Sequence, residues 1–291
     1  MTKSTFGGFV KLTRIMDSLL WIVRHRRAIT SYGKDMKRFQ DMIIGKTRSL
    51  LLLVLGGVCF LGAGGCGPMR FNQEVAGESV FFGYSAESRP IEGELFGKGE
   101  DVIFILAAIH GNEQAGTRLV ASLSDYLCRH PRLLGGRCVV LMPVANPDGV
   151  ERNSRGNSYG VDLNRNFATA NHVHSARHGE EPLSEPETRI IAAVIRQWQP
   201  DRILSIHQPL NCLDYDGQSE ALAEHLAGYG PLPLKKLGSL PGSLGSYAAE
   251  RNIPIITLEL PRAADQEDSD ALWNTYGGYL RAAITYPDVA E

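Results

Sequence analysis

Cysteine is scarce in this chain, since five occur among 291 residues and no two of them are spaced Cys-x-x-Cys. Such pairs supply structural metal sites and redox motifs, so their absence argues against both roles. Cys59 and Cys66 lie towards the N-terminus, which leaves Cys128, Cys138 and Cys212, an odd number, in the rest of the chain. A disulfide between Cys128 and Cys138 and a set of separate buried thiols are both open interpretations.

A surplus of basic charge is lacking beyond the N-terminal region. Residues 1–48 contain eleven Lys and Arg against three Asp, a net charge of +8, whereas the whole chain carries −2, so the remainder carries −10. Nucleic-acid-binding domains need a basic surface, and the acidic remainder therefore predicts no nucleic-acid partner. Internal repeats and low-complexity tracts are also missing, and 43% hydrophobic with 21% charged residues is an ordinary globular composition.

The apolar segment 50–61 is short for a membrane-spanning helix. It follows Lys46 and Arg48 and precedes a run of small residues that ends at Cys66, an order typical of an export signal. The end of this segment resembles a bacterial lipoprotein cleavage site with Cys66 as the lipidated residue, although Ala63 stands where leucine is usual. A plain secretory signal and an uncleaved membrane anchor are the alternatives.

The sequence therefore predicts a signal peptide of lipoprotein type over residues 42–66, a linker over 67–79 and a single folded domain over 80–291. We expect this domain to be exported, either into the periplasm or anchored to the membrane through Cys66. Residues 1–41 are an uncertain leader, because a signal peptide normally begins close to its charged region. Met36 or Met42 would then be the true start; if Met1 is the start instead, residues 17–23 would form a short amphipathic or interfacial segment.

Short buried strands alternate with amphipathic helices in the folded domain. This alternation predicts an α/β domain with a mostly buried sheet. Strands are expected at 80–84, 102–109, 138–142, 203–206 and 253–260, and helices after Glu113, after Ser184, after Glu220, over 245–251 and over 271–285.

Two of the predicted strands are followed by a histidine. His110 opens the motif His110-Gly111-Asn112-Glu113 after strand 102–109, and His207 follows strand 203–206. Open α/β sheets bind ligands at the carboxyl ends of their strands, so we expect the two histidines to converge. Two histidines and one carboxylate leave one coordination position open, as a catalytic zinc site requires. The sequence thus predicts one Zn²⁺ ion held by His110, Glu113 and His207, with hydrolytic chemistry.

A carboxylate also lies within the apolar strand 253–260. Burial of the Glu259 carboxylate in that position costs free energy, so it is expected to be paired or functional. One interpretation is a general base that takes a proton from the attacking water and returns it to the leaving amine. The alternative is a structural salt bridge between Glu259 and a nearby arginine.

Five motifs in order resemble those of the zinc carboxypeptidases of the carboxypeptidase A type, over roughly residues 80–280. The resemblance implies a single-domain twisted mixed β-sheet flanked by helices, and a zinc-dependent hydrolase of peptides in which the metal ligands and Glu259 have the roles given above. The motifs are His110-x-x-Glu113, Asn146-Pro147-Asp148-Gly149, Val161 to Phe167, His207, and Thr257-Leu258-Glu259-Leu260.

Three arginines and one asparagine receive roles from the same resemblance. Asn164 and Arg165 match the pair that binds the substrate's terminal carboxylate, for which a planar guanidinium offers two parallel hydrogen bonds. Arg155 matches the arginine that stabilises the oxyanion, and Arg152 is the alternative for that role.

Within the family, the chain is most similar to the murein peptide amidases, bacterial enzymes that cut the bond from γ-D-glutamate to meso-diaminopimelate in cell-wall peptides. Residues 184–189, 207–217 and 241–247 carry this narrower likeness. Digestive carboxypeptidases also have a tyrosine on a mobile loop before the catalytic glutamate, but residues 235–242 contain none, and Tyr229 and Tyr247 are imperfectly placed substitutes. This departure puts an aromatic lid in doubt and agrees with the amidase likeness.

Meso-diaminopimelate carries an extra ammonium and carboxylate, so a pocket for it needs at least one acid. Asp214 and Asp216 follow His207 closely, and Asp214 is the candidate partner of that ammonium group. The alternative is that Asp-Tyr-Asp-Gly is simply a turn.

Three other functions remain open: a zinc carboxypeptidase acting on ordinary C-terminal peptides, a zinc deacylase of small acylated amino acids, and a non-catalytic peptide-binding lipoprotein. The motifs favour the peptidase. A silent binding protein should have lost a zinc ligand or the general base, and neither is missing here. His172, His174 and His178 form a second cluster, which we interpret as a solvated loop rather than a second metal site, because no carboxylate or cysteine completes a metal-ligand spacing.

Overall fold

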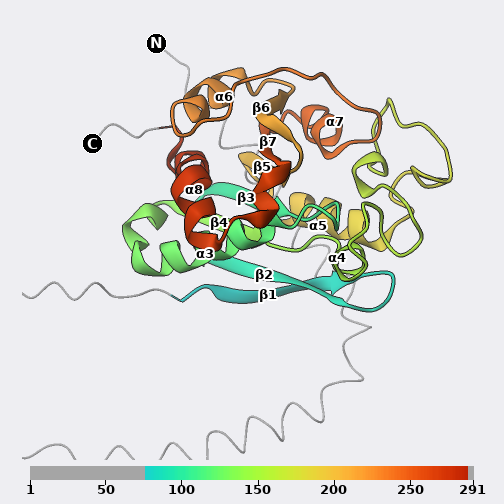
Figure 1. Ribbon diagram of the computed structural model, residues 1–291, viewed down its shortest axis with the longest axis horizontal. Coiled ribbons are helices and arrows are strands. Elements are labelled where there is room, and N and C mark those ends of the chain that lie inside the picture. The colour runs from blue at the N-terminus through green and yellow to red at the C-terminus, as the bar shows by residue number, and fades with distance from the viewer. Residues whose placement is uncertain (1–75, 288–291) are drawn as a thin grey trace, which may run out of the picture. The chain divides into compact units, whose positions relative to one another are not determined.

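The computed structural model describes residues 76–287 (Figure 1). The predicted leader 1–41, the signal peptide 42–66 with Cys66, and most of the linker 67–79 lie outside the described residues, so those assignments stay predictions. The first strand begins at Glu78, two residues before the predicted start of the folded domain.

Within the described residues, seven strands form one mixed sheet in the order β1-β2-β4-β3-β5-β7-β6. The four strands β4, β3, β5 and β7 run parallel, and β1, β2 and β6 pair antiparallel at the two sides. The strands are β1 (Glu78–Tyr84), β2 (Pro90–Gly97), β3 (Asp101–Ala107), β4 (Arg137–Met142), β5 (Arg202–His207), β6 (Leu210–Asp216) and β7 (Ile255–Pro261).

Helices cover both faces of the sheet, which confirms the predicted fold class of a single mixed sheet flanked by helices (Figure 1). Short 3₁₀ turns occupy Pro131–Leu134, Leu163–Arg165 and Arg262–Gln266. The α-helices are α3 (Ala115–Arg129), α4 (Pro147–Glu151), α5 (Pro186–Trp198), α6 (Glu220–Ala227), α7 (Leu244–Ala249) and α8 (Ser269–Thr285).

Local chemistry explains where several helices begin. Asn146 caps α4 and Pro147 follows it at the first helical position, where a missing N–H costs nothing. Ser243 caps α7 and Asp268 caps α8, each by accepting a hydrogen bond from a backbone N–H of the first turn. Polar residues with this capping role therefore set the ends of three helices.

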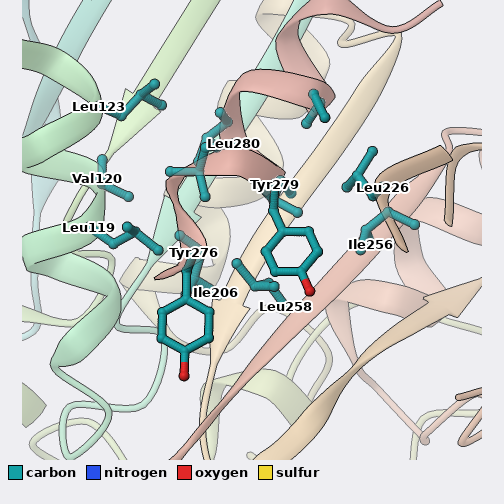
Figure 2. Close-up of a cluster of buried hydrophobic side chains, with 14 of the residues drawn as sticks. Leu119, Val120, Leu123, Ile206, Leu226, Ile256, Leu258, Tyr276, Tyr279 and Leu280 are labelled. Carbon is teal, nitrogen blue, oxygen red and sulfur yellow. The ribbon is translucent and has the colours of Figure 1, made fainter. Parts of the chain in front are cut away.

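Successive side chains of each strand point to opposite faces of the sheet, so the core has two layers. On β3, Ile103 and Ile105 face one layer, whereas Phe104 and Leu106 face the other. Helices α3, α6 and α8 cover the first face, where their side chains meet those of β5 and β7 (Figure 2). Helices α5 and α7 contribute to the second layer.

Two strands were not predicted. Strand β2 contains a proline and two glycines, which weaken a strand pattern, and β6 was treated as part of a motif and a turn. Strand β3 ends at Ala107, two residues earlier than predicted, because Ala108 has a positive φ of 52° that breaks the extended chain.

The described cysteines are free thiols. Cys138 and Cys212 are buried and Cys128 is half-buried, so the structure has separate thiols and no disulfide between Cys128 and Cys138. Among residues 76–287, no helix combines the length and the apolar character needed to cross a bilayer.

Candidate metal centre and active site

Three neighbouring parallel strands deliver the predicted site residues to one edge of the sheet. His110 lies three residues beyond the end of β3, and His207 is the last residue of β5. Glu259, near the end of β7, is the register partner of His207. Because parallel strands place their carboxyl ends together, residues almost a hundred and fifty positions apart become neighbours.

The same three strands also fix the face on which these side chains lie. Leu204 and Ile206 of β5, like Leu258 and Leu260 of β7, belong to the layer covered by α3 and α8. By strand alternation, His207 and Glu259 therefore project to the opposite face. Helix α7 packs on that face against β6 and β7.

The loop between β3 and α3 is held by the motif Asn146-Pro147-Asp148-Gly149. The Asn146 side-chain amide donates to the carbonyl of Ile109 at 3.1 Å and accepts from the Gly149 N–H at 2.9 Å. Gly111 passes so close to Gly149 that a Cβ on Gly111 would lie 1.9 Å from the Gly149 carbonyl carbon. This motif therefore supports the loop that carries His110.

His110, Glu113 and His207 form one buried cluster of potential metal ligands. The Glu113 carboxylate lies 2.8 Å from His110 Nδ1 and 2.9 Å from His207 Nδ1, and the two Nδ1 atoms are 3.2 Å apart. Ligands that are ~2.0 to 2.1 Å from a tetrahedral zinc ion lie roughly 3.3 Å from one another. The spacing and the donor types thus fit a zinc ion with three protein ligands.

Asp162 orients this cluster from behind, and the sequence interpretation did not single it out. Its carboxylate lies 3.1 Å from His110 Nε2 and accepts from Arg155 Nε at 2.8 Å. An Nε2 proton donated to Asp162 leaves the Nδ1 lone pair of His110 for a cation. Burial raises the pKa of Asp162, but the hydrogen bond with His110 and the charge of Arg155 outweigh burial and hold that pKa well below its usual range.

The structure distinguishes between the two arginines considered for stabilising the oxyanion. Arg155 also donates to Glu113 Oε1 at 3.3 Å, which places its guanidinium beside the metal cluster. Arg152 instead contacts Glu87 and the carbonyl of Ser158. Of the two, Arg155 is thus the one in contact with a proposed metal ligand.

Glu259 has no arginine partner among the described residues, which makes the salt-bridge alternative wrong. Its Oε2 accepts a hydrogen bond from the Leu210 N–H at 3.3 Å, and the side chain is 9% exposed. Burial raises the pKa of Glu259, while the neighbouring His207 partly offsets this effect. A raised pKa brings a carboxylate closer to the range in which it can accept and return a proton.

Asn164 and Arg165 lie in a 3₁₀ turn against the N-terminus of α7. Asn164 Oδ1 accepts from the Leu244 N–H at 2.8 Å, which leaves its NH₂ group as a donor. Arg165 donates to the Asn164 carbonyl at 2.6 Å and forms no ion pair with another described residue. Burial lowers the pKa of Arg165, yet a guanidinium stays charged, so an unpaired half-buried cation lies there.

Asp214 lies in strand β6, so the interpretation of its segment as a simple turn is wrong. Its register partner is Thr257, two residues before Glu259, and it lies on the same sheet face as Glu259 because Leu213 and Tyr215 face the other layer. Asp214 Oδ1 accepts from the Leu237 N–H at 2.8 Å, and burial raises the pKa of Asp214.

Neither tyrosine considered for the lid replaces the missing one. Tyr247 is buried in α7 with the Arg251 guanidinium 3.4 Å above its ring. Tyr229 lies beside α8, on the other face of the sheet, where its carbonyl approaches Gly278. Tyr247 is packed in the core, and Tyr229 is exposed on the opposite face of the sheet, so neither supplies an aromatic lid for the site.

In the second histidine cluster, His174 and His178 have local hydrogen-bond partners, whereas the ring nitrogens of His172 have none within the described residues. His174 Nδ1 lies 2.5 Å from the Glu180 carbonyl and His178 Nδ1 lies 3.2 Å from the Val173 carbonyl. Across residues 76–287, the group formed by His110, Glu113 and His207 is the one with metal-ligating geometry.

Comparisons of sequence and structure relate this chain to known zinc enzymes. The sequence model of the zinc carboxypeptidases matches residues 76–224. Murein peptide amidase A of Escherichia coli K12 is 37% identical over 199 residues, which cover 61% of this chain and 78% of that protein. The crystal structure of murein-tripeptide amidase from Escherichia coli O157 is 29% identical and covers 72% of this chain and 93% of that one, with a TM-score of 0.59. Carboxypeptidase A of Helicoverpa armigera, 21% identical over 74% of this chain and 70% of that one, has a TM-score of 0.61 and shares the fold.

The chain belongs to the zinc carboxypeptidase family and is a hydrolase. The family is zinc-dependent, and the described residues contain a His-Glu-His cluster that suits this metal. The family match ends at residue 224, before Glu259, so the position of Glu259 rests on its register with His207.

Proposed function

We propose that this protein is a zinc-dependent amidase of murein peptides that hydrolyses the bond from γ-D-glutamate to meso-diaminopimelate. The observation that carries the proposal is the meeting of His110, Glu113 and His207 beside Glu259 at the strand ends. The identity to murein peptide amidase A, 37% over 78% of that protein, supports the choice of substrate.

Arg165 and Asn164 would bind the carboxylate of the leaving diaminopimelate. Arg165 keeps its charge without an ion-pair partner in the described part of the chain, and the amide NH₂ of Asn164 has hydrogens to donate. An arginine can hold a carboxylate through two parallel hydrogen bonds, which fixes the orientation of the scissile bond. Asp214, on the face of the sheet that carries Glu259, would accept the side-chain ammonium of the same residue.

A zinc ion held by His110, Glu113 and His207 would polarise the scissile carbonyl and acidify the attacking water. Glu259 takes the proton of that water and returns it to the leaving amine. Arg155 uses its Nε and one terminal nitrogen on Asp162 and Glu113, so its other terminal nitrogen can donate to the developing oxyanion.

The test is release of diaminopimelate from L-Ala-γ-D-Glu-meso-diaminopimelate by the full chain loaded with zinc. Glu259→Gln should retain zinc but lose about 100- to 10,000-fold in kcat, the range for removal of a general base. Glu224→Gln, an exposed glutamate on α6, is the matched control and should keep full activity. Mass spectrometry would follow the product and metal analysis the zinc content.

Failure to release diaminopimelate by the zinc-loaded wild type would overturn the proposal. Activity on ordinary C-terminal peptides would then indicate a carboxypeptidase, and activity on small acylated amino acids would indicate a deacylase. A protein that binds no zinc would instead be a non-catalytic binding protein. Export through residues 42–66 with lipidation of Cys66 stays a prediction, and it would place the enzyme on the side of the membrane where murein lies.

A further inference from the structure

A pocket of about 250 Å³ adjoins the metal cluster. Glu113 and Arg155 line it together with Asn112, Gln208, Arg262 and Asp265. Its volume is below the ~300 Å³ at which sites for drug-sized ligands begin, so it suits a single residue of a peptide. The pocket is therefore lined by one proposed metal ligand, Glu113, and by the proposed oxyanion residue, Arg155.

Most polar groups of this pocket are already bonded. Asp265 Oδ1 accepts from the Ala115 N–H at the start of α3 at 3.0 Å. Gln208 accepts from the same N–H at 3.3 Å and donates to the Pro261 carbonyl at 3.4 Å. Arg155 is committed to Asp162 and Glu113.

Arg262 is different. It begins the 3₁₀ turn that follows β7, three residues after Glu259, and its side chain is exposed. The Arg262 side chain forms no hydrogen bond or ion pair with another residue in the described part of the chain, and neither does the side chain of Asn112. A guanidinium and an amide with free donors therefore line the same pocket.

This pocket lies apart from the residues proposed to bind the leaving group. Asn164 and Arg165 contact segment 242–244 at the start of α7, and neither lines the pocket. The pocket instead adjoins the start of α3 through Gln208 and Asp265. The two groups of residues would therefore hold different parts of the substrate, with the leaving residue at Asn164 and Arg165 and the acyl residue in the pocket.

We infer that Arg262, with Asn112 as a second donor, binds a carboxylate on the acyl-side residue of the substrate and so favours an acidic residue, such as γ-linked glutamate, over a neutral one. In a γ-linked glutamyl residue the free α-carboxylate is four carbon–carbon bonds from the scissile carbonyl carbon, roughly 5 Å in an extended chain. An acyl-side residue with a neutral side chain and an α-linkage carries no carboxylate at that distance. The inference rests on the proposed function and names the group that the acyl-side pocket recognises.

Two substrates that differ in one group test the inference. One is L-Ala-γ-D-Glu-meso-diaminopimelate, and the other is the same peptide with the glutamyl α-carboxylate converted to an amide. We expect wild-type kcat/KM to favour the carboxylate by about tenfold, because charge-assisted hydrogen bonds at an exposed site are of modest strength. Arg262→Gln should remove most of this preference, with a larger loss on the carboxylate substrate than on the amide.

Two further variants separate recognition from general damage. Arg262→Lys should keep part of the preference, since it keeps the charge but loses the paired donors. Arg132→Gln, at an exposed arginine in the 3₁₀ turn Pro131–Leu134, should keep all of it. The discrimination of the wild type should also decrease as salt concentration rises.

The outcomes are distinguishable. Equal kcat/KM of the wild type on both substrates, or an equal loss on both in Arg262→Gln, would overturn the inference while the proposed function stands. Release of diaminopimelate from neither substrate by the zinc-loaded wild type would overturn the proposed function and the inference with it.

Discussion

Asp162 joins the metal ligands to the arginine of the site. One oxygen lies 3.1 Å from His110 Nε2 and the other accepts from Arg155 Nε. Carboxylates in this position set the tautomer and the ring orientation of a ligating histidine. Asp162→Asn should therefore lower the affinity for zinc about 10- to 100-fold, as measured by competition with a chelator of known affinity.

Asp125→Asn is the matched control for that prediction, because Asp125 is an exposed residue of α3 whose side chain makes no contact with the site. It should leave zinc affinity unchanged. If Asp162→Asn binds zinc as tightly as the wild type, then Asp162 does not orient His110. The buried carboxylate would then serve only as a partner of Arg155.

The sequence predicted the residues of the metal cluster better than those that support it. His110 follows an apolar strand and His207 ends one, so their convergence could be inferred from strand order. Asp162 lies within the motif Val161 to Phe167, and this position was the one sequence feature that could have identified it. A carboxylate that supports a metal ligand has no distinctive spacing of its own. Arg155 and Arg152 could be separated only by the path of a loop, which periodicity does not describe.

At the scale of elements, buried parallel strands were predictable and outer strands were not. Strands β3, β4, β5 and β7 are near-continuous apolar runs, because both of their faces are covered. Strand β6 carries two aspartates and an asparagine, which are typical of turns, and it depends on its pairing with β7. Long-range pairing, rather than local sequence, determines such a strand.

Helix α8 offers a test of one such long-range contact. The Tyr279 hydroxyl accepts a hydrogen bond from the Leu232 N–H at 2.6 Å within the core layer of Figure 2. Tyr279→Phe would leave that buried N–H without a partner, at a cost of about 1 to 2 kcal/mol in the free energy of unfolding. Urea denaturation monitored by circular dichroism would measure the loss.

Tyr276→Phe is the control on the same helix, since Tyr276 is also buried but its hydroxyl makes no hydrogen bond within the described chain. Its free energy of unfolding should stay within about 0.5 kcal/mol of the wild type. Equal effects of the two substitutions would show that the aromatic rings, and not the hydrogen bond of Tyr279, determine the stability.

At the scale of the whole molecule, the outer hairpin of β1 and β2 is tied to the loop that carries the metal ligands. The fully buried Asp148 of α4 accepts hydrogen bonds from Ser85 Oγ, the Glu87 N–H and the Arg89 guanidinium, all in the turn between these strands. The start of α4 in turn holds the carbonyl of Ile109. Stability at one side of the sheet therefore supports the geometry of the site.

This link predicts how stability responds to acid. Burial raises the pKa of Asp148, but hydrogen bonds from Arg89, Ser85 and the Glu87 N–H outweigh it and leave the pKa below its usual value. The ionised carboxylate thus stabilises the native state above the unfolded pKa of about 3.9, and this contribution is lost as pH falls through the native pKa.

Asp148→Asn should accordingly lower the free energy of unfolding by about 2 kcal/mol at pH 7, because it removes a charged acceptor from a buried network. The difference from the wild type should shrink as the pH falls below the unfolded pKa of about 3.9 and through the lower native pKa, where the wild-type carboxylate becomes protonated and resembles the amide. Urea denaturation of both proteins across that range would measure it, with Asp125→Asn as a control that stays close to the wild type at every pH. A difference that stays constant with pH would mean that Asp148 contributes through its shape and packing, and that the hairpin is held by contacts that do not depend on its charge.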